Sequence, residues 1–240
     1  MSDDMAKTKI LIVEDEPALV EVLTYNLQRE GYEVAAAREG KEGLRRAQTL
    51  MPDLLVLDLM LPGMGGLEIC RELRASTKTA KIPILMLTAK AEESDQLVGF
   101  AMGADDYVTK PFSVKVLLQR IKVLLRRATD PEPTGDVLEA AGIHIDKRGH
   151  NVRVDGATIA LTPTEFRLLE TLLKQPGRAF TRPDLLDSAI GDAIVLDRTI
   201  DVHIKTLRRK LGKRGDRIET VRGIGYRFQS TDEGRVKGGE

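Results

Sequence analysis

The chain has 240 residues, 42% hydrophobic and 31% charged, and its 37 basic side chains balance 37 acidic ones. This length allows one or two domains with cores of their own, and the zero net charge does not by itself indicate a nucleic-acid-binding protein. No apolar run reaches membrane-spanning length, and residues 1–5 lack the basic and apolar regions of a signal peptide. The single cysteine, Cys70, allows no internal disulfide, so we expect a cytoplasmic protein with Cys70 as a small core residue.

The first half of the chain alternates short apolar runs with longer amphipathic segments. Strands are expected at residues 9–13, 32–36, 54–58, 82–88 and 105–110, and helices at residues 17–30, 41–50, 67–74, 94–102 and 113–127. Branched apolar runs this short are typical of strands buried on both faces of a parallel sheet. Five such units predict an α/β doubly wound, five-stranded parallel sheet with right-handed crossovers.

Polar side chains stand at the carboxyl ends of four expected strands, where open parallel sheets bind ligands. Glu14 and Asp15 follow the first strand, Asp58 ends the third, Thr88 ends the fourth and Lys110 ends the fifth. Crowded carboxylates repel one another by roughly 4 kcal/mol per pair at about 4 Å and an effective dielectric near 20. Mg²⁺, usually held by one or two carboxylates and by phosphate oxygens, would relieve this repulsion.

A carboxylate beside Mg²⁺ can attack phosphorus and form an aspartyl phosphate. Lys110 would then neutralise phosphoryl charge and Thr88 would hydrogen-bond a phosphoryl oxygen, so that positioning and electrostatics carry the reaction. Plainer interpretations compete. An aspartate at a strand end often only caps the next turn, and the glycine-rich residues 62–66, which lack the Lys-Ser/Thr of a phosphate-binding loop, more simply allow a tight turn beside Asp58.

These residues together resemble the receiver domain of bacterial response regulators, a flavodoxin-like fold, over about the first half of the chain. The resemblance implies that Asp58 is the phosphorylated aspartate. It also implies that Asp15, Asp58 and the backbone carbonyl of Met60 hold Mg²⁺, with Glu14 binding through water or lying just outside the ligands.

Three further receiver positions follow from the same resemblance. Thr88 is the switch hydroxyl, Tyr107 is the switch aromatic side chain, and Lys110 binds the phosphoryl group before a cis Pro111. We therefore expect a receiver domain over residues 8–127.

The pattern changes after residues 128–136, a linker with two prolines, a glycine and no apolar side chain larger than alanine. Short strands are expected at residues 137–140, 143–146, 151–154 and 158–161, helices at residues 162–174, 181–190 and 197–211, and a hairpin at residues 218–228. Residues 137–229 thus look like an α+β winged helix-turn-helix domain, which places its third helix in the major groove. The tail, residues 230–240, looks disordered.

The segments at residues 197–204 and 220–228 closely resemble the DNA-binding domain of OmpR/PhoB-type regulators, so the resemblance spans residues 8–229. It implies that DNA is contacted by Arg198, Thr199, Val202, His203, Lys205, Thr206, Arg209 and, in the minor groove, Arg222. Alternatives stay open for three side chains: His203 could be structural, and Arg208 and Lys210 could be solvated rather than bound to phosphates. Residues 196–227 carry ten basic and four acidic side chains, which also fits a solvated charged face.

Two positions depart from phosphate-responsive relatives. Thr206 stands where they usually have a base-reading arginine, whose contact with guanine is worth roughly 1–3 kcal/mol of discrimination, so a different DNA site is expected. Ile190 stands where they carry a tryptophan before the recognition helix, which bears on contact with RNA polymerase, an implied partner.

The family also implies a receiver dimer. Its expected face comprises Leu97, Phe100, Asp105, Asp106, Leu118, Arg120, Lys122 and Arg127. Gln96 and Val116 replace a common basic–acidic pair, so we expect burial to hold this dimer more than ion pairs, which contribute about 0–1 kcal/mol each when exposed.

The resemblance implies a non-enzymatic two-component transcription regulator. A sensor histidine kinase phosphorylates Asp58 with Mg²⁺, the receiver dimerises, and two DNA-binding domains occupy tandem half-sites of double-stranded DNA. Two rivals remain: a constitutive DNA-binding protein with a vestigial receiver, and an aspartate-nucleophile phosphatase. Met60, two residues after Asp58, offers no general acid for the phosphatase.

Overall fold

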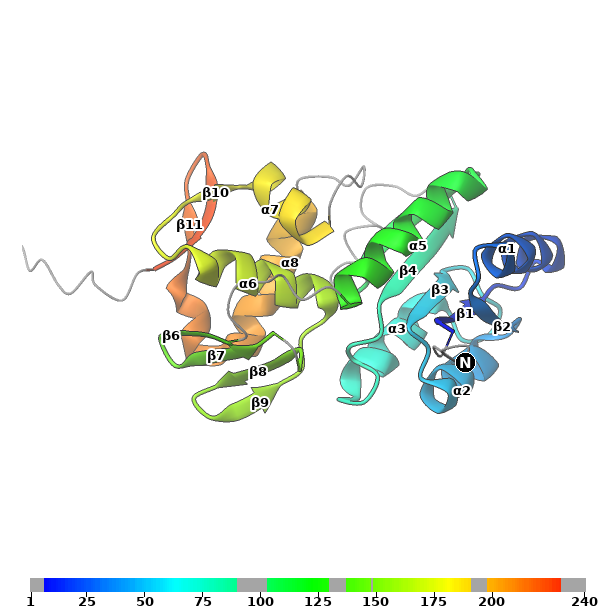
Figure 1. Ribbon diagram of the computed structural model, residues 1–240, viewed down its shortest axis with the longest axis horizontal. Coiled ribbons are helices and arrows are strands. Elements are labelled where there is room, and N and C mark those ends of the chain that lie inside the picture. The colour runs from blue at the N-terminus through cyan, green and yellow to red at the C-terminus, as the bar shows by residue number, and fades with distance from the viewer. Residues whose placement is uncertain (1–6, 90–102, 130–136, 148, 191–197, 230–240) are drawn as a thin grey trace, which may run out of the picture. The chain divides into compact units, whose positions relative to one another are not determined.

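A computed structural model describes residues 7–89, 103–129, 137–147, 149–190 and 198–229, which form two compact units within residues 1–130 and 131–240 (Figure 1). The expected helix at residues 94–102, most of the linker at residues 128–136 and the tail at residues 230–240 lie outside the described residues, as do Leu97 and Phe100. No helix among the described residues combines the length and apolar character needed to cross a membrane.

The first unit is built on a five-stranded parallel sheet, as predicted, and its strand order is β2-β1-β3-β4-β5. Its described elements are β1 (Lys9–Val13), α1 (Pro17–Arg29), β2 (Glu33–Ala37), α2 (Gly40–Leu50), β3 (Leu54–Asp58), α3 (Gly66–Ala75), β4 (Ile84–Ala89), β5 (Asp106–Lys110) and α5 (Val114–Thr129).

Helices cover both faces of this sheet, which is why its strands are apolar throughout. Leu23 and Leu27 of α1 and Leu117 of α5 pack in one cluster with alternate residues of β1, β3 and β4. On the other face Gly43 brings the backbone of α2 against Val13; an added Cβ would lie 2.5 Å from that side chain. Cys70 of α3 is buried, as predicted, and burial raises the pKa of its thiol to about 11.

The register of the strands aligns their carboxyl ends along one edge of the sheet. Val13 pairs with Leu57, so Glu14 follows level with Asp58. Asp58 pairs with Leu87, and Ala89 pairs with Lys110. The polar residues that follow or end these strands therefore meet at one edge.

The second unit holds a four-stranded antiparallel sheet, three helices and a three-stranded sheet in the order β10-β12-β11 (Figure 1). Its elements are β6 (Val137–Ala140), β7 (Ile143–Asp146), β8 (Asn151–Val154), β9 (Ala157–Ile159), α6 (Pro163–Lys174), β10 (Phe180–Thr181), α7 (Arg182–Ile190), α8 (Arg198–Leu211), the 3-10 helix η1 (Gly212–Arg217), β11 (Ile218–Val221) and β12 (Gly225–Phe228). The sequence did not predict β10 or η1.

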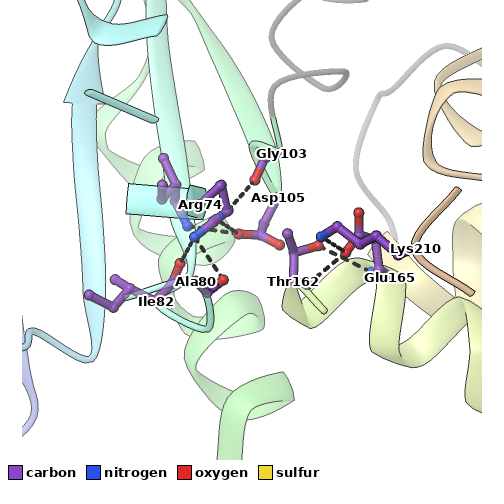
Figure 2. Close-up of polar contacts among 9 residues, drawn as sticks. Arg74, Ala80, Ile82, Gly103, Asp105, Thr162, Glu165 and Lys210 are labelled. Atoms are coloured by element: carbon purple, nitrogen blue, oxygen red, sulfur yellow. Dashed lines mark hydrogen bonds and ion pairs between the residues drawn. The ribbon is translucent and has the colours of Figure 1, made fainter. Parts of the chain in front are cut away.

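Glu165 ties two helices of this unit together (Figure 2). Its carboxylate accepts the backbone N–H of Thr162 at 2.8 Å, while the Thr162 hydroxyl accepts the N–H of Glu165 at 3.3 Å, a reciprocal cap that begins α6. The same carboxylate accepts Lys210 Nζ at 2.6 Å from the last turn of α8. The start of α6 and the end of α8 are therefore held as one piece.

Candidate functional site

An acidic pocket forms where β1 and β3 end. Carboxylate oxygens of Glu14, Asp15 and Asp58 lie within 4.8 Å of one another, with Glu14 and Asp58 buried and Asp15 exposed. Lys110 Nζ lies 2.7 Å from Glu14 Oε2 and 2.7 Å from Asp58 Oδ2. The structure thus brings together four of the residues that the sequence placed at this edge.

Burial and charge set the protonation of this pocket. Burial raises the pKa of Glu14, although its hydrogen bond with Lys110 opposes the rise. Burial alone would lower the pKa of Lys110, but hydrogen bonds to Asp58 and Glu14 outweigh it and hold that pKa above its usual range. Lys110 is therefore a permanent cation, with its ammonium held between two carboxylates.

Both carboxylate oxygens of Asp58 accept hydrogen bonds from other groups of the protein. Oδ2 accepts Lys110, and Oδ1 accepts the backbone N–H of Met60 at 3.0 Å. Met60 itself is 72% exposed, whereas Asp58 is 3% exposed. The peptide between Lys110 and Pro111 is cis, as predicted.

The donor set of the pocket fits a hard divalent cation. Carboxylate oxygens are the ligands that Mg²⁺ prefers, and Mg²⁺ keeps several waters beside one or two carboxylates. Asp15 is exposed and lies next to the buried Asp58, so a cation bound by both carboxylates would keep some of its water ligands. This edge of the sheet therefore contains an acidic cluster that could bind a metal.

Thr88 and Tyr107 are both buried in the first unit. Thr88 pairs with Thr109 at the carboxyl end of β4, which places it at the same edge as Asp58. Tyr107 points into the protein, where burial raises the pKa of its hydroxyl and the Cys70 thiol adds to the rise. In this structure the aromatic side chain therefore already occupies an inward position.

Asp105 is not a surface residue of a dimer face, which corrects the expectation from sequence. It is 0% exposed, and its Oδ2 accepts Arg74 Nη2 at 2.8 Å (Figure 2). The same oxygen accepts the Ile84 N–H at 2.9 Å. Arg74, from α3, also donates to the carbonyls of Gly103, Ala80 and Ile82 at 2.8, 3.1 and 2.7 Å. The sequence pattern did not predict this buried pair, which joins α3 to the starts of β4 and β5.

The other described members of the expected dimer face lie on β5 and α5. Asp106 is 3% exposed, and Arg120 Nη1 donates to both of its oxygens at 2.6 and 2.7 Å within the first unit, so Asp106, like Asp105, is not a surface residue of a dimer face. Lys122 pairs with Glu30, which follows the last residue of α1, at 2.5 Å in an exposed position. Leu118 is half-buried against the core. The side chain of Arg127 lies outside the described residues.

The predicted DNA-contacting residues divide into exposed and buried sets. Lys205, Arg209 and Arg222 are exposed, and Val202 and Thr206 are half-buried. Thr199 and His203 are each 1% exposed, so they cannot touch DNA without a rearrangement, and we remove both from the contact set. The side chains of Arg198 and Ile190 lie outside the described residues.

His203 gives the second unit a pH-dependent stability. Burial, together with Lys210, lowers its pKa to about 4, whereas the unfolded value is 6.5. Between these values the unfolded state binds more protons, so stability present above pH 6.5 is lost as the pH falls toward 4. At about 1.4 kcal/mol per pKa unit the loss is roughly 3 kcal/mol.

Denaturant unfolding of the second unit at about pH 7 and about pH 4.5 measures this loss. We expect His203→Gln to be less sensitive to acid than the wild type, and His144→Gln, a change at a half-buried histidine of β7, to behave like the wild type. Equal acid sensitivity of wild type and His203→Gln would contradict the assignment.

Arg208 and Lys210 are both bound within the domain. Arg208 donates to the Ile218 carbonyl and the Thr220 hydroxyl, and Lys210 pairs with Glu165. Neither the solvated nor the phosphate-bound interpretation of these two residues describes this arrangement.

Comparisons with known proteins match both units. The response regulator receiver domain family matches residues 10–122, and the family described as transcriptional regulatory protein, C terminal, matches residues 156–228. The phosphate regulon transcriptional regulatory protein PhoB of Rhizobium meliloti is 49% identical over 225 residues, which cover 92% of this chain and 99% of that protein. The sensory transduction protein RegX3 of Mycolicibacterium smegmatis is 42% identical over 229 residues, covering 92% and 99%. A solved structure of a RitR mutant has a TM-score of 0.76 at 29% identity and covers 93% of this chain and 99% of its own.

Proposed function

The chain belongs to the OmpR/PhoB-type response regulators, and we propose that phosphorylation of Asp58 is the event that controls its DNA binding. It is a phosphorylation-dependent DNA-binding transcriptional regulator of a two-component system. The observation that carries the proposal is the position of Asp58, buried among carboxylates with Lys110 at 2.7 Å.

A partner histidine kinase donates the phosphoryl group. One oxygen of Asp58 forms the new bond to phosphorus as the bond to the kinase histidine breaks, and Lys110 neutralises the charge on the phosphoryl oxygens. Asp15, Asp58 and the Met60 carbonyl would hold Mg²⁺, with Glu14 acting through water or from just outside the ligands. When bound, Mg²⁺ supplies further charge neutralisation and orients the phosphoryl group.

Phosphorylation replaces the single negative charge of the Asp58 carboxylate with a phosphoryl group that carries about −1.5 to −2 charges. Thr88 moves toward the phosphoryl oxygens, and Tyr107 occupies the inward position that this structure already has. Such a change shifts a two-state equilibrium only by its differential stabilisation of the active state, about 5.5 kcal/mol for a shift from 1:99 to 99:1.

The active receiver dimerises, and the two DNA-binding domains occupy tandem half-sites. We place the dimer face on Leu97, Phe100, Leu118, Arg120, Lys122 and Arg127, and DNA contacts on Arg198, Val202, Lys205, Thr206, Arg209 and Arg222. A regulator bound at a promoter also contacts RNA polymerase, which we propose as a further partner. Because the protein must reach DNA, we propose that it is cytoplasmic. The basic, exposed side chains of α8 and the hairpin support this surface.

Intact mass spectrometry tests the phosphoacceptor. Wild-type protein with Mg²⁺ and an acyl phosphate donor is expected to gain one phosphoryl group, whereas Asp58→Asn gains none. Asp53→Asn, a change at an exposed aspartate at the amino end of β3, is the matched control and should gain one group. Phosphoryl uptake by Asp58→Asn equal to that of the wild type would refute the assignment. Steady turnover of a phosphomonoester would favour the phosphatase instead.

A further inference from the structure

Side-chain hydrogen bonds join the recognition helix α8 to the hairpin β11–β12 at two points, here called clips. The first clip is in the first turn of α8, where Asp201 Oδ1 accepts the Tyr226 hydroxyl of β12 at 2.8 Å. The same oxygen accepts Arg182 Nε of α7 at 2.7 Å. This carboxylate therefore holds the start of α8 against both the hairpin and the preceding helix.

The second clip is Arg208, two turns further along α8. Its Nε and Nη2 donate to the Ile218 carbonyl at 3.0 and 2.6 Å, and Nη2 also donates to the Thr220 hydroxyl at 3.0 Å. These bonds use three of the five N–H donors of the guanidinium group. The Arg208 Cζ atom also lies 5.4 Å from the centre of the Tyr226 ring, within the range of a cation–π contact.

Both clips act on paired residues 218–220 and 226–228 of the hairpin, here called its base, and neither bonds residues 222–224 at its tip. Ile218 pairs with Phe228 and Thr220 with Tyr226 in the antiparallel ladder. Beyond them the turn carries the exposed Arg222 and Ile224 around Gly223, whose φ is +74°. A rigid base with an exposed basic tip is the arrangement expected of a wing that must reach a fixed distance from its helix.

We propose that Arg208 is a positioning residue for the wing: it fixes the hairpin base to α8, so that Arg222 reaches DNA when α8 lies in the major groove. This inference rests on the proposed DNA-binding function. Without the hydrogen bonds of the Arg208 guanidinium, the hairpin must be ordered when the protein binds DNA. This ordering lowers the DNA affinity and weakens or removes the Arg222 contact.

A salt-dependence series with the phosphorylated full chain tests the proposal. The probe is a duplex recovered from a randomised pool by selection with wild-type protein. Arg222→Ala should lower the slope of log affinity against log salt by about 1, as for the loss of one phosphate contact. Arg208→Met should lower it by the same amount. The double variant should lose no more than either single change, because both remove the same contact.

Two comparisons separate positioning from other roles. Arg208→Lys keeps a cation but loses the planar fork, so it should resemble Arg208→Met. Arg209→Ala, a change at the adjacent exposed arginine, should instead combine additively with Arg222→Ala. If the Arg208–Arg222 double variant loses about 2 units of slope, or Arg208→Lys binds like the wild type, Arg208 contacts phosphate itself and the proposal fails.

A purely structural role has its own signature. Arg208→Met would then lower the melting temperature and leave both affinity and slope unchanged well below it, which also overturns the proposal. If neither Arg209→Ala nor Arg222→Ala changes binding, the DNA-reading surface proposed above is wrong, and this inference falls with it. That failure is distinguishable because it appears in variants that leave Arg208 intact.

Discussion

Arg74→Met is expected to lower the free energy of unfolding of the receiver by about 3–5 kcal/mol, because it leaves a buried charge without its partner. Asp105, 0% exposed, would keep only the Ile84 N–H of the two bonds described for its Oδ2. The carbonyls of Gly103, Ala80 and Ile82 would also lose a charged donor. Denaturant unfolding followed by circular dichroism measures the change.

The matched control lies one turn earlier on the same helix. Arg71→Met changes an exposed arginine whose nearest carboxylate, on Glu72, is 3.9 Å away, so its effect should stay within about 0.5 kcal/mol. Equal stability of the Arg74 and Arg71 variants would mean that water or a neighbouring side chain compensates Asp105. The buried pair would then not be the tie between α3, β4 and β5 described above.

Lys110→Met is expected to slow phosphoryl uptake by about 100-fold or more, the usual cost of removing one fixed group that stabilises developing charge. The Lys110 ammonium lies 2.7 Å from Asp58 Oδ2, where the phosphoryl oxygens must be accommodated. Its removal also leaves Glu14 and Asp58 as neighbouring carboxylates without their shared cation. Time-resolved intact mass spectrometry with Mg²⁺ and an acyl phosphate gives the rate.

Lys115→Met is the control for this change, because Lys115 is exposed at the start of α5. It should phosphorylate at the wild-type rate. Wild-type uptake by Lys110→Met would show that the ammonium is dispensable and that another cation meets the phosphoryl charge.

The receiver sheet and its pocket were predictable because each strand carries its own signal. A buried parallel strand must be apolar throughout, so the polar residue that ends it stands out in β1, β3 and β4. Once these strands and β5 are parallel neighbours, their carboxyl ends coincide, and the meeting of Glu14 and Asp58 with Lys110, which ends β5, follows from the register.

The Arg74–Asp105 pair was not predictable in the same way. Its members are 31 residues apart, and most of the donors of Arg74 go to backbone carbonyls, which leave no trace in a side-chain pattern. Asp105 and Asp106 look alike in sequence, yet each is buried by a different arginine. A charged residue in a segment that is expected to form an interface is therefore not necessarily exposed.

The burial of Thr199 and His203 did have a sequence signal. These residues and Leu207 recur every four positions along α8 and lie beside the stripe of Ile200 and Ile204, so the buried face is wider than its apolar residues suggest. A polar side chain in line with Leu207 is better predicted as core than as DNA-contacting. The two-residue β10 is too short to give any periodic pattern.

The central claim is that phosphorylation of Asp58 switches this chain, and light scattering tests it most directly. The molar mass would be measured for wild type and Asp58→Asn, each with Mg²⁺ and with or without an acyl phosphate. We predict that only the phosphorylated wild type doubles its mass and that Asp58→Asn stays monomeric throughout. A dimer under every condition, or a donor-driven dimer of Asp58→Asn, would contradict the claim and favour constitutive DNA binding.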